Sequence, residues 1–267
     1  MASLTVLQWV TLIAAALFIG LSKTAFPGSA TLSVVMFAAV IPARASTAMM
    51  LLLLLTGDLI AIWTYRRDAD WHTLRKLLPT VVVGVVVGAI FLNFTSDLVM
   101  KRSIGWIVLV LTAITLFNMR ASKRADKPGV GDSAGASRVK TDAEVSDERT
   151  QNVFARTFYG MLGGFTTMAA NAGGPVMTLY FLWSRFPVKR FLGTTAWFFF
   201  LINVVKLPFS IGIGLITPAI LPVDAALAIF VIIGALFGRW VIRYIKQSVF
   251  DPIVITLTVI SSIYLVL

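Results

Sequence analysis

Residues 45–65 read ASTAMMLLLLLTGDLIAIWTY, an apolar run in which Asp58 carries the only charge. A helix needs about 20 mostly apolar residues to cross the hydrocarbon core of a bilayer. The run therefore predicts a membrane-spanning helix. Its carboxylate is conspicuous, because a charged side chain at the centre of a bilayer costs at least about 2.5–3.5 kcal/mol.

The composition of the whole chain agrees with this stretch. Of its 267 residues, 58% are hydrophobic and only 13% are Asp, Glu, Lys or Arg. Soluble domains average roughly 45–50% apolar and 25% charged residues, so this chain has too few polar residues to cover a soluble globule. Soluble, disordered and nucleic-acid-binding classes are excluded. With no Cys and one His, we expect no catalytic residue, no metal site and no cofactor.

Further apolar stretches fall into a long and a short group. The long ones are predicted spans: 77–94, 102–118, 191–214, 222–241 and 250–267. The short ones form two successive pairs: 4–21 with 28–41, and 153–168 with 174–185. Short apolar runs are more often re-entrant or buried than spanning. We expect re-entrant hairpins or broken helices there, with full spans as the alternative.

A polar stretch at 119–152 divides the chain, and its mixed charge, Gly and Ser predict a flexible linker. It separates a first transmembrane repeat, 1–118, from a second, 153–267. Landmarks recur in the same order in both repeats. Pro42 is matched by Pro187, and the GxxxG pair Gly84 and Gly88 is matched by Gly234 and Gly238. Internal repeats of this kind are typical of secondary transporters.

Basic residues predict how the chain is oriented. Eighteen of the 23 Lys and Arg residues fall in four segments: 66–76, 119–156, 185–190 and 239–246. Because cytoplasmic loops are enriched in Lys and Arg, we place these segments and the linker in the cytoplasm and both termini outside. Three spans in each half then make the second half inverted. We predict an all-α integral protein of the inner membrane, with two inverted repeats of one short helix pair plus three transmembrane helices.

Polar residues gather where the two short pairs turn. The first turn, SKTAFPGS at 22–29, contains Lys23, Thr24, Pro27 and Gly28. The second, TTMAANAGGP at 166–175, contains Thr166, Thr167, Asn171, Gly173 and Gly174. Irregular backbone at membrane depth is tolerated where it lines a watery cavity, and helix N-termini there suit anions. The alternative is ordinary turns at the membrane surface, with Lys23 among lipid headgroups.

Two further charges lie inside predicted spans. Lys206 lies within 191–214, with Asn203 nearly one turn before it. Ionisable residues at such positions are functional-site hypotheses by default; the alternative for Lys206 is snorkelling or structural pairing at a kink near Pro208. Asp58 is expected to pair with Lys23 or Lys206, or to accept a proton for coupling.

The two turns, the Pro-x-Arg/Lys step after each and the GxxxG helix in each half resemble the sulfite exporter TauE/SafE family. The stretch from Gly163-Gly164-Phe165 through Asn171-Ala172-Gly173-Gly174-Pro175 is most similar to it. The resemblance covers nearly the whole chain outside the linker. It implies transport of sulfite, organosulfonates or other small sulfur-containing anions across the inner membrane. Ser22-Lys23-Thr24 replaces glycines common in the family, which makes Lys23 a candidate selectivity residue.

These observations favour a transporter that exports sulfite or a short organosulfonate by alternating access at a midplane site. The proposed substrate contacts are Lys23, Thr24, Pro27, Gly28, Thr166, Thr167, Asn171, Gly173, Gly174, Asn203 and Lys206, with Asp58 for coupling or charge pairing. The expected partners are a small anion and the lipid bilayer, with no nucleic acid; a homo-oligomer stays open. Two alternatives remain: a transporter of thiosulfate or a carboxylate, and an intramembrane lipid-phosphate hydrolase.

Overall fold

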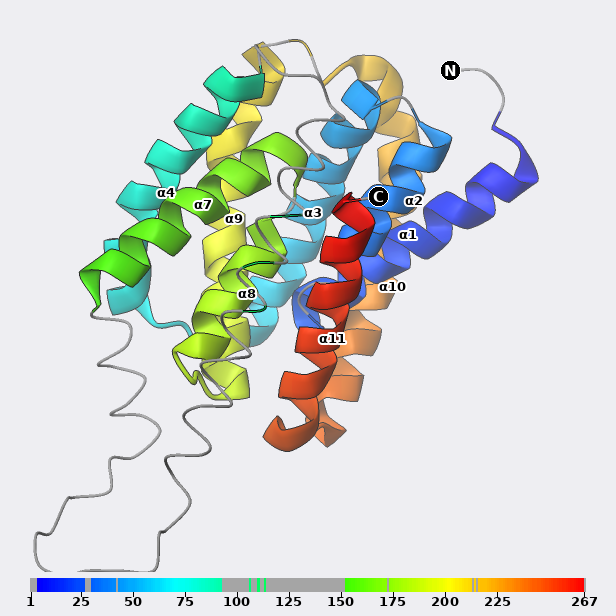
Figure 1. The fold of residues 1–267 in the computed structure, drawn as a ribbon. Helices are drawn as coiled ribbons and strands as arrows, with labels where there is room; N and C mark the ends of the chain where they lie inside the picture. Colours follow the sequence, from blue (N-terminus) through cyan, green and yellow to red (C-terminus); the bar gives the residue numbers. More distant parts are fainter. Residues whose placement is uncertain are drawn as a thin grey trace, which may run out of the picture.

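A computed structural model describes residues 4–26, 30–41, 43–92, 106, 110, 113, 152–171, 173–212, 214 and 216–266. The span predicted at 102–118 and the linker at 119–152 therefore lie almost entirely outside the described residues. All elements in the described part are helical (Figure 1).

The helices of the first half whose bounds the structure describes are α1 (Val6–Thr24), α2 (Ala30–Val40), α3 (Ala43–Tyr65) and α4 (Trp71–Leu92). The described helices of the second half are α7 (Val153–Ala170), α8 (Gly173–Trp183), α9 (Val188–Gly212), α10 (Leu221–Val241) and α11 (Gln247–Val266). Two 3₁₀ turns, η1 (Pro218–Ile220) and η2 (Ile242–Tyr244), lie on either side of α10. Five segments of the described part are long and apolar enough to cross a membrane: Val6–Thr24, Ala45–Tyr65, Trp71–Phe91, Val188–Gly212 and Pro218–Tyr244. The prediction of an all-α membrane protein is confirmed.

The first helix of each short pair is longer than its apolar run suggests. α1 has 19 residues and α7 has 18, whereas α2 and α8 have 11 each. α1 continues through polar residues because their hydroxyls find carbonyl acceptors: Ser22 donates to Ile19 O of its own helix at 2.7 Å, and Thr24 donates to Ala235 O of α10 at 2.8 Å. Lys23 therefore lies in the last turn of a helix, and the second helix of each pair is too short to span.

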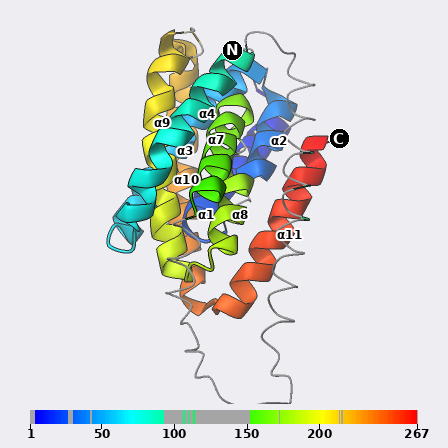
Figure 2. The same cartoon turned by 60° about the vertical axis from the view of Figure 1, so that its left-hand side comes forward.

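The two halves interlock by exchanging their fourth helices. α10 packs along α1 and against α3, whereas α4 packs along α7 and against α9. Figure 2 shows α4 beside α7, with α11 on the α8 side. The buried apolar side chains accordingly form two cores, one among α1, α2, α3 and α10 and the other among α4, α7, α8, α9 and α11. The bundles meet where α3 packs against α9.

Glycines allow the exchanged helices to approach at backbone distance. A Cβ added at Gly84 of α4 would lie 2.0 Å from the carbonyl oxygen of Met161 in α7. A Cβ at Gly234 of α10 would lie 2.3 Å from the carbonyl oxygen of Leu17 in α1. Because real side chains never come so close, only glycine fits at either position. Gly84 and Gly234 of the two GxxxG motifs therefore serve close helix packing.

The basic loops of the described part gather at one end of the bundle. In Figure 1 the α3–α4 connection, the start of α7, the α8–α9 connection and the α10–α11 connection lie at the lower end. The α9–α10 connection lies at the upper end. This arrangement agrees with placing the basic loops on one side of a membrane; which side is cytoplasmic remains a prediction.

Candidate functional site

A buried ionic cluster lies where the two bundles meet. Lys23 Nζ is 2.6 Å from Asp58 Oδ1, and Asn203 Nδ2 donates to Asp58 Oδ2 at 2.7 Å. The Asp58 side chain is fully buried and that of Lys23 is 8% exposed. The C-terminal turn of α1 suits a cation, because the last helical carbonyls carry partial negative charge. Three helices, α1, α3 and α9, thus join at a single carboxylate.

The Asp58–Asn203 bond joins positions that the predicted repeat would make equivalent. The residues are 145 apart, the same separation as between the repeated Pro42 and Pro187. α3 and α9 therefore meet through matching positions, one carrying an acid and the other an amide. Pro42 itself lies outside the described residues.

The second intramembrane lysine holds the turn between α7 and α8. Lys206, 2% exposed, donates from Nζ to the Thr167 carbonyl oxygen at 2.9 Å and to Asn171 Oδ1 at 2.5 Å. Asn171 ends α7 in the left-handed region, at φ 52° and ψ 24°. Since a lysine ammonium only donates, the Asn171 oxygen must face it, and the amide nitrogen is left to donate elsewhere.

A cavity opens beside this cluster, with an empty volume of about 540 Å³ that includes the space at its mouth. α1 contributes Ser22 and Lys23, and the α7–α8 turn contributes Thr167, Asn171, Gly174 and Pro175. The remaining lining residues come from α2, α3 and α9: Ala30, Leu54, Thr195, Ala196, Phe199 and Asn203. Polar and apolar side chains both line it, as in many small-molecule sites.

At formal charges, Lys23, Asp58 and Lys206 leave one positive charge in excess. Lys23 Nζ also lies 4.8 Å from the centroid of the Phe199 ring, so this ammonium is held between a carboxylate and an aromatic face. A positive excess with amide and hydroxyl donors suits an anion. In the described part of the chain, no group of three or more His, Asp or Glu side chains is placed to hold a metal ion.

The other predicted site residues are placed differently. The hydroxyl of Thr24 donates to the Ala235 carbonyl oxygen at 2.8 Å, which ties α1 to α10. The hydroxyl of Thr166 donates to the Leu162 carbonyl oxygen at 2.8 Å within α7. Gly173 packs against Thr167, where an added Cβ would lie 2.7 Å from the Thr167 Cβ.

Four predicted site residues are not among the described residues that line the cavity: Thr24, Thr166, Gly173 and Lys206. Pro27 and Gly28 lie outside the described residues. Five predicted site residues do line the cavity: Lys23, Thr167, Asn171, Gly174 and Asn203. The predicted set thus divides into residues at the cavity surface and residues that hold its walls.

Sequence reasoning missed seven lining positions, among them Thr195 and Phe199. Both lie on α9, eight and four residues before Asn203, so the three side chains share one helix face. Extending the helical spacing backward from Asn203 would have found them. Leu54 and Ser22 carry no comparable signal, because leucine is common in every span and Ser22 lies in a mixed polar turn.

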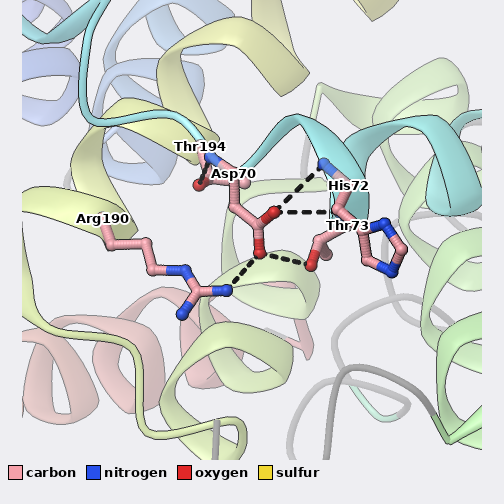
Figure 3. Close-up of polar contacts among 5 residues, drawn as sticks. All are labelled: Asp70, His72, Thr73, Arg190 and Thr194. Atoms are coloured by element: carbon pink, nitrogen blue, oxygen red, sulfur yellow. Dashed lines mark hydrogen bonds and ion pairs between the residues drawn. The ribbon is translucent and has the colours of Figure 1, made fainter. Parts of the chain in front are cut away.

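A second polar cluster connects α9 to the basic end of the bundle (Figure 3). Asp70 precedes α4 and accepts backbone bonds from His72 and Thr73 at 3.1 Å and a hydroxyl bond from Thr73 at 2.6 Å. Arg190 of α9 forms an ion pair with the same carboxylate, and the Asp70 N–H donates to the Thr194 hydroxyl at 3.0 Å.

The pKa of Asp70 is shifted by competing effects. Burial acts to raise it, but hydrogen bonds from Thr73 and Arg190 together outweigh burial, so the pKa lies below the usual 3.8. Asp70 is therefore ionised at neutral pH, and it links the α3–α4 loop to the first turn of α9.

Comparison with known proteins was made over the full chain. The model of a family described as "Sulfite exporter TauE/SafE" matches residues 12–265. No curated protein and no solved structure matches. The matched region contains both interlocked bundles and the buried cluster between them. The chain therefore belongs to the sulfite exporter TauE/SafE family of membrane transporters.

Proposed function

We propose that this protein exports a small sulfur-containing anion, sulfite or a short organosulfonate, across the inner membrane. One observation carries the proposal: a cavity lined by Lys23, Asn171 and Asn203 lies beside a buried cluster with one positive charge in excess. Desolvated charges interact strongly, so an anion that loses its water on entering the cavity gains compensating attraction and hydrogen bonds.

Alternating access is the proposed mechanism, because the site lies between two bundles of corresponding construction. α1 and α7 cross the view of Figure 1 in opposite senses, which supports an inverted relation between the halves. Rocking of one bundle against the other about the α3–α9 contact would open the cavity first to the cytoplasm and then to the outside. The exchanged helices α4 and α10 move with the bundle into which they pack.

Energetics favour export without obligatory coupling. Moving one elementary charge across a membrane potential is worth about 2.3 kcal/mol per 100 mV. In a cell that is negative inside, this term drives an anion outward. Asp58 is engaged by both Lys23 and Asn203, and this favours charge pairing for Asp58 over proton coupling.

Flux in reconstituted vesicles tests the proposal. Vesicles loaded with sulfite, methanesulfonate, thiosulfate or acetate are compared for release through wild type, Lys23→Ala and Lys206→Ala. Lys23→Ala leaves Asp58 unpaired beside the cavity, and Lys206→Ala releases the α7–α8 turn, so both should abolish anion flux. Lys76→Ala is the matched control, since Lys76 is exposed on α4.

The substrate pattern separates the alternatives. Release of sulfite and methanesulfonate well above thiosulfate and acetate supports the proposed substrate class. Equal or faster release of thiosulfate or acetate assigns the protein to another small anion. Persistent flux in both lysine variants, with thermal unfolding like that of wild type, places the site elsewhere.

A further inference from the structure

Thr195 is a buried hydroxyl that the protein itself does not satisfy. It is 8% exposed and lines the cavity, and its Oγ1 has no hydrogen-bond partner in the described structure. Threonines in the membrane helices normally donate to the carbonyl four residues earlier, as Thr56, Thr64 and Thr166 do. Thr195 makes no such bond, so its hydroxyl proton is left without a partner among the described residues.

Three neighbouring polar groups of the cavity already have partners within the protein. Lys23 and Asn203 both bind Asp58, and the Ser22 hydroxyl donates to the Ile19 carbonyl oxygen. Burying a hydroxyl removes its water without replacement unless a partner is supplied. A ligand in the cavity is the partner that the geometry leaves open.

We propose that Thr195 Oγ1 donates directly to an oxygen of the transported anion and sets its selectivity. Asn171 faces the same cavity and has its amide oxygen held by Lys206, so its amide nitrogen is the second donor. Lys23 supplies the charge. The ligand class is therefore an oxyanion whose oxygens reach both donors, such as a sulfonate or sulfite. This inference rests on the proposed transport function and adds a substrate contact on α9.

Isosteric removal of the hydroxyl tests this contact. Purified full-length protein in detergent is titrated with sulfite and with methanesulfonate by calorimetry, for wild type and Thr195→Val. Hydrogen bonds to charged groups are strong, so we expect Thr195→Val to weaken binding by about tenfold or more. Its thermal unfolding without ligand should match wild type, because no bond within the protein is lost.

Thr178→Val is the matched control. Thr178 of α8 is also buried with an unpartnered hydroxyl among the described residues, but it is not among those that line the cavity. This control should bind as wild type does. Thr195→Ser should restore affinity, and Thr195→Ala provides a second variant without the hydroxyl.

The outcomes separate this inference from the function on which it rests. Equal affinity in wild type, Thr195→Val and Thr195→Ala overturns the Thr195 contact while leaving anion transport standing. Equal weakening by Thr178→Val and Thr195→Val also overturns it, since the effect would then be general to the fold. A wild type that binds neither sulfite nor methanesulfonate overturns the proposed substrates and this contact together.

Discussion

At the scale of single residues, Asn171 combines two roles that substitutions can separate. Its left-handed backbone closes α7, and its amide oxygen accepts from Lys206. Asparagine and glycine tolerate this conformation, whereas alanine pays about 1–2 kcal/mol for it. Asn171→Ala should therefore lower the free energy of unfolding by about 1 kcal/mol more than Asn171→Gly does. Both variants should lose anion flux, because both lack the amide.

Thermal unfolding in detergent and flux in vesicles measure these two roles on the same preparations. If Asn171→Gly transports at the wild-type rate, the backbone conformation alone is what transport requires and the amide is no ligand. If Asn171→Ala is as stable as Asn171→Gly, the turn relaxes out of the left-handed region when its side chain is changed.

The charged residues show how far sequence reasoning reaches at this scale. Lys23, Asp58 and Lys206 are recognisable from the cost of a charge in a span. Which lysine pairs with Asp58 depends on how α1, α3 and α9 are rotated against one another, and no local pattern records that. The structure pairs Asp58 with Lys23 and turns Lys206 toward Asn171. Thr195 is uncharged, so only its spacing from Asn203 could have indicated it.

At the scale of elements, Asp70 joins the N-terminus of α4 to the first turn of α9. Because its folded pKa lies below the unfolded value, the unfolded chain binds more protons as the solution is acidified. The stabilisation is fully present above the unfolded pKa and is lost as pH falls through the folded pKa. We expect Asp70→Asn to destabilise the protein by about 1–3 kcal/mol near neutral pH, with a difference from wild type that shrinks below about pH 4.

Tryptophan fluorescence during thermal unfolding provides the measurement, since Trp71 and Trp197 lie in contact near this link, with ring centroids 4.8 Å apart. Asp68→Asn removes the same charge from the same loop and serves as the control. A wild-type advantage over Asp70→Asn that is constant from neutral pH down to about pH 3 would contradict the argument.

The ends of a helix could be predicted from the sequence wherever the apolar run and the helix begin and end at nearly the same residues. The spans at 45–65 and 222–241 agree with α3 and α10 within two residues. The first helix of each short pair was underestimated, because hydropathy ends at polar residues whereas the helix does not. The Ser22 hydroxyl donates to its own helix, the Thr24 hydroxyl donates to α10, and Lys23 finds its counter-charge on α3. Such compensation comes from tertiary contacts and leaves no trace in a hydropathy profile.

At the scale of the whole molecule, the sequence predicts two repeats but not the exchange of helices between the two halves. Recurring Pro and GxxxG landmarks give the order of elements in each half, and this order says nothing about which helices touch. Gly84 and Gly234 indicate that another helix packs closely at these positions, but they do not identify which helix it is. Only the structure shows that α4 packs on α7 and that α10 packs on α1. Each bundle therefore contains one helix from the other half.

The sidedness of this interlocked molecule yields the last prediction. Thr5 and Asn152 are the corresponding N-caps of α1 and α7, and both are exposed. If the halves are inverted, these two positions lie on opposite faces of the membrane. The chain has no Cys, so a single introduced cysteine is the only thiol that a maleimide can modify. Loss of either cap costs only about 1 kcal/mol, which leaves the fold intact.

A membrane-impermeant maleimide should label Thr5→Cys in intact cells and Asn152→Cys only in inside-out vesicles. Arg67→Cys and Thr217→Cys are the controls, at exposed positions in the α3–α4 and α9–α10 connections. Arg67→Cys should follow Asn152→Cys, and Thr217→Cys should follow Thr5→Cys, because these connections lie at opposite ends of the bundle. Labelling of Thr5→Cys and Asn152→Cys from the same face would mean that the halves run parallel, and the alternating-access proposal would lose its structural basis. Labelling from opposite faces but with the sides reversed would keep the inversion and place the basic loops outside, against the positive-inside rule.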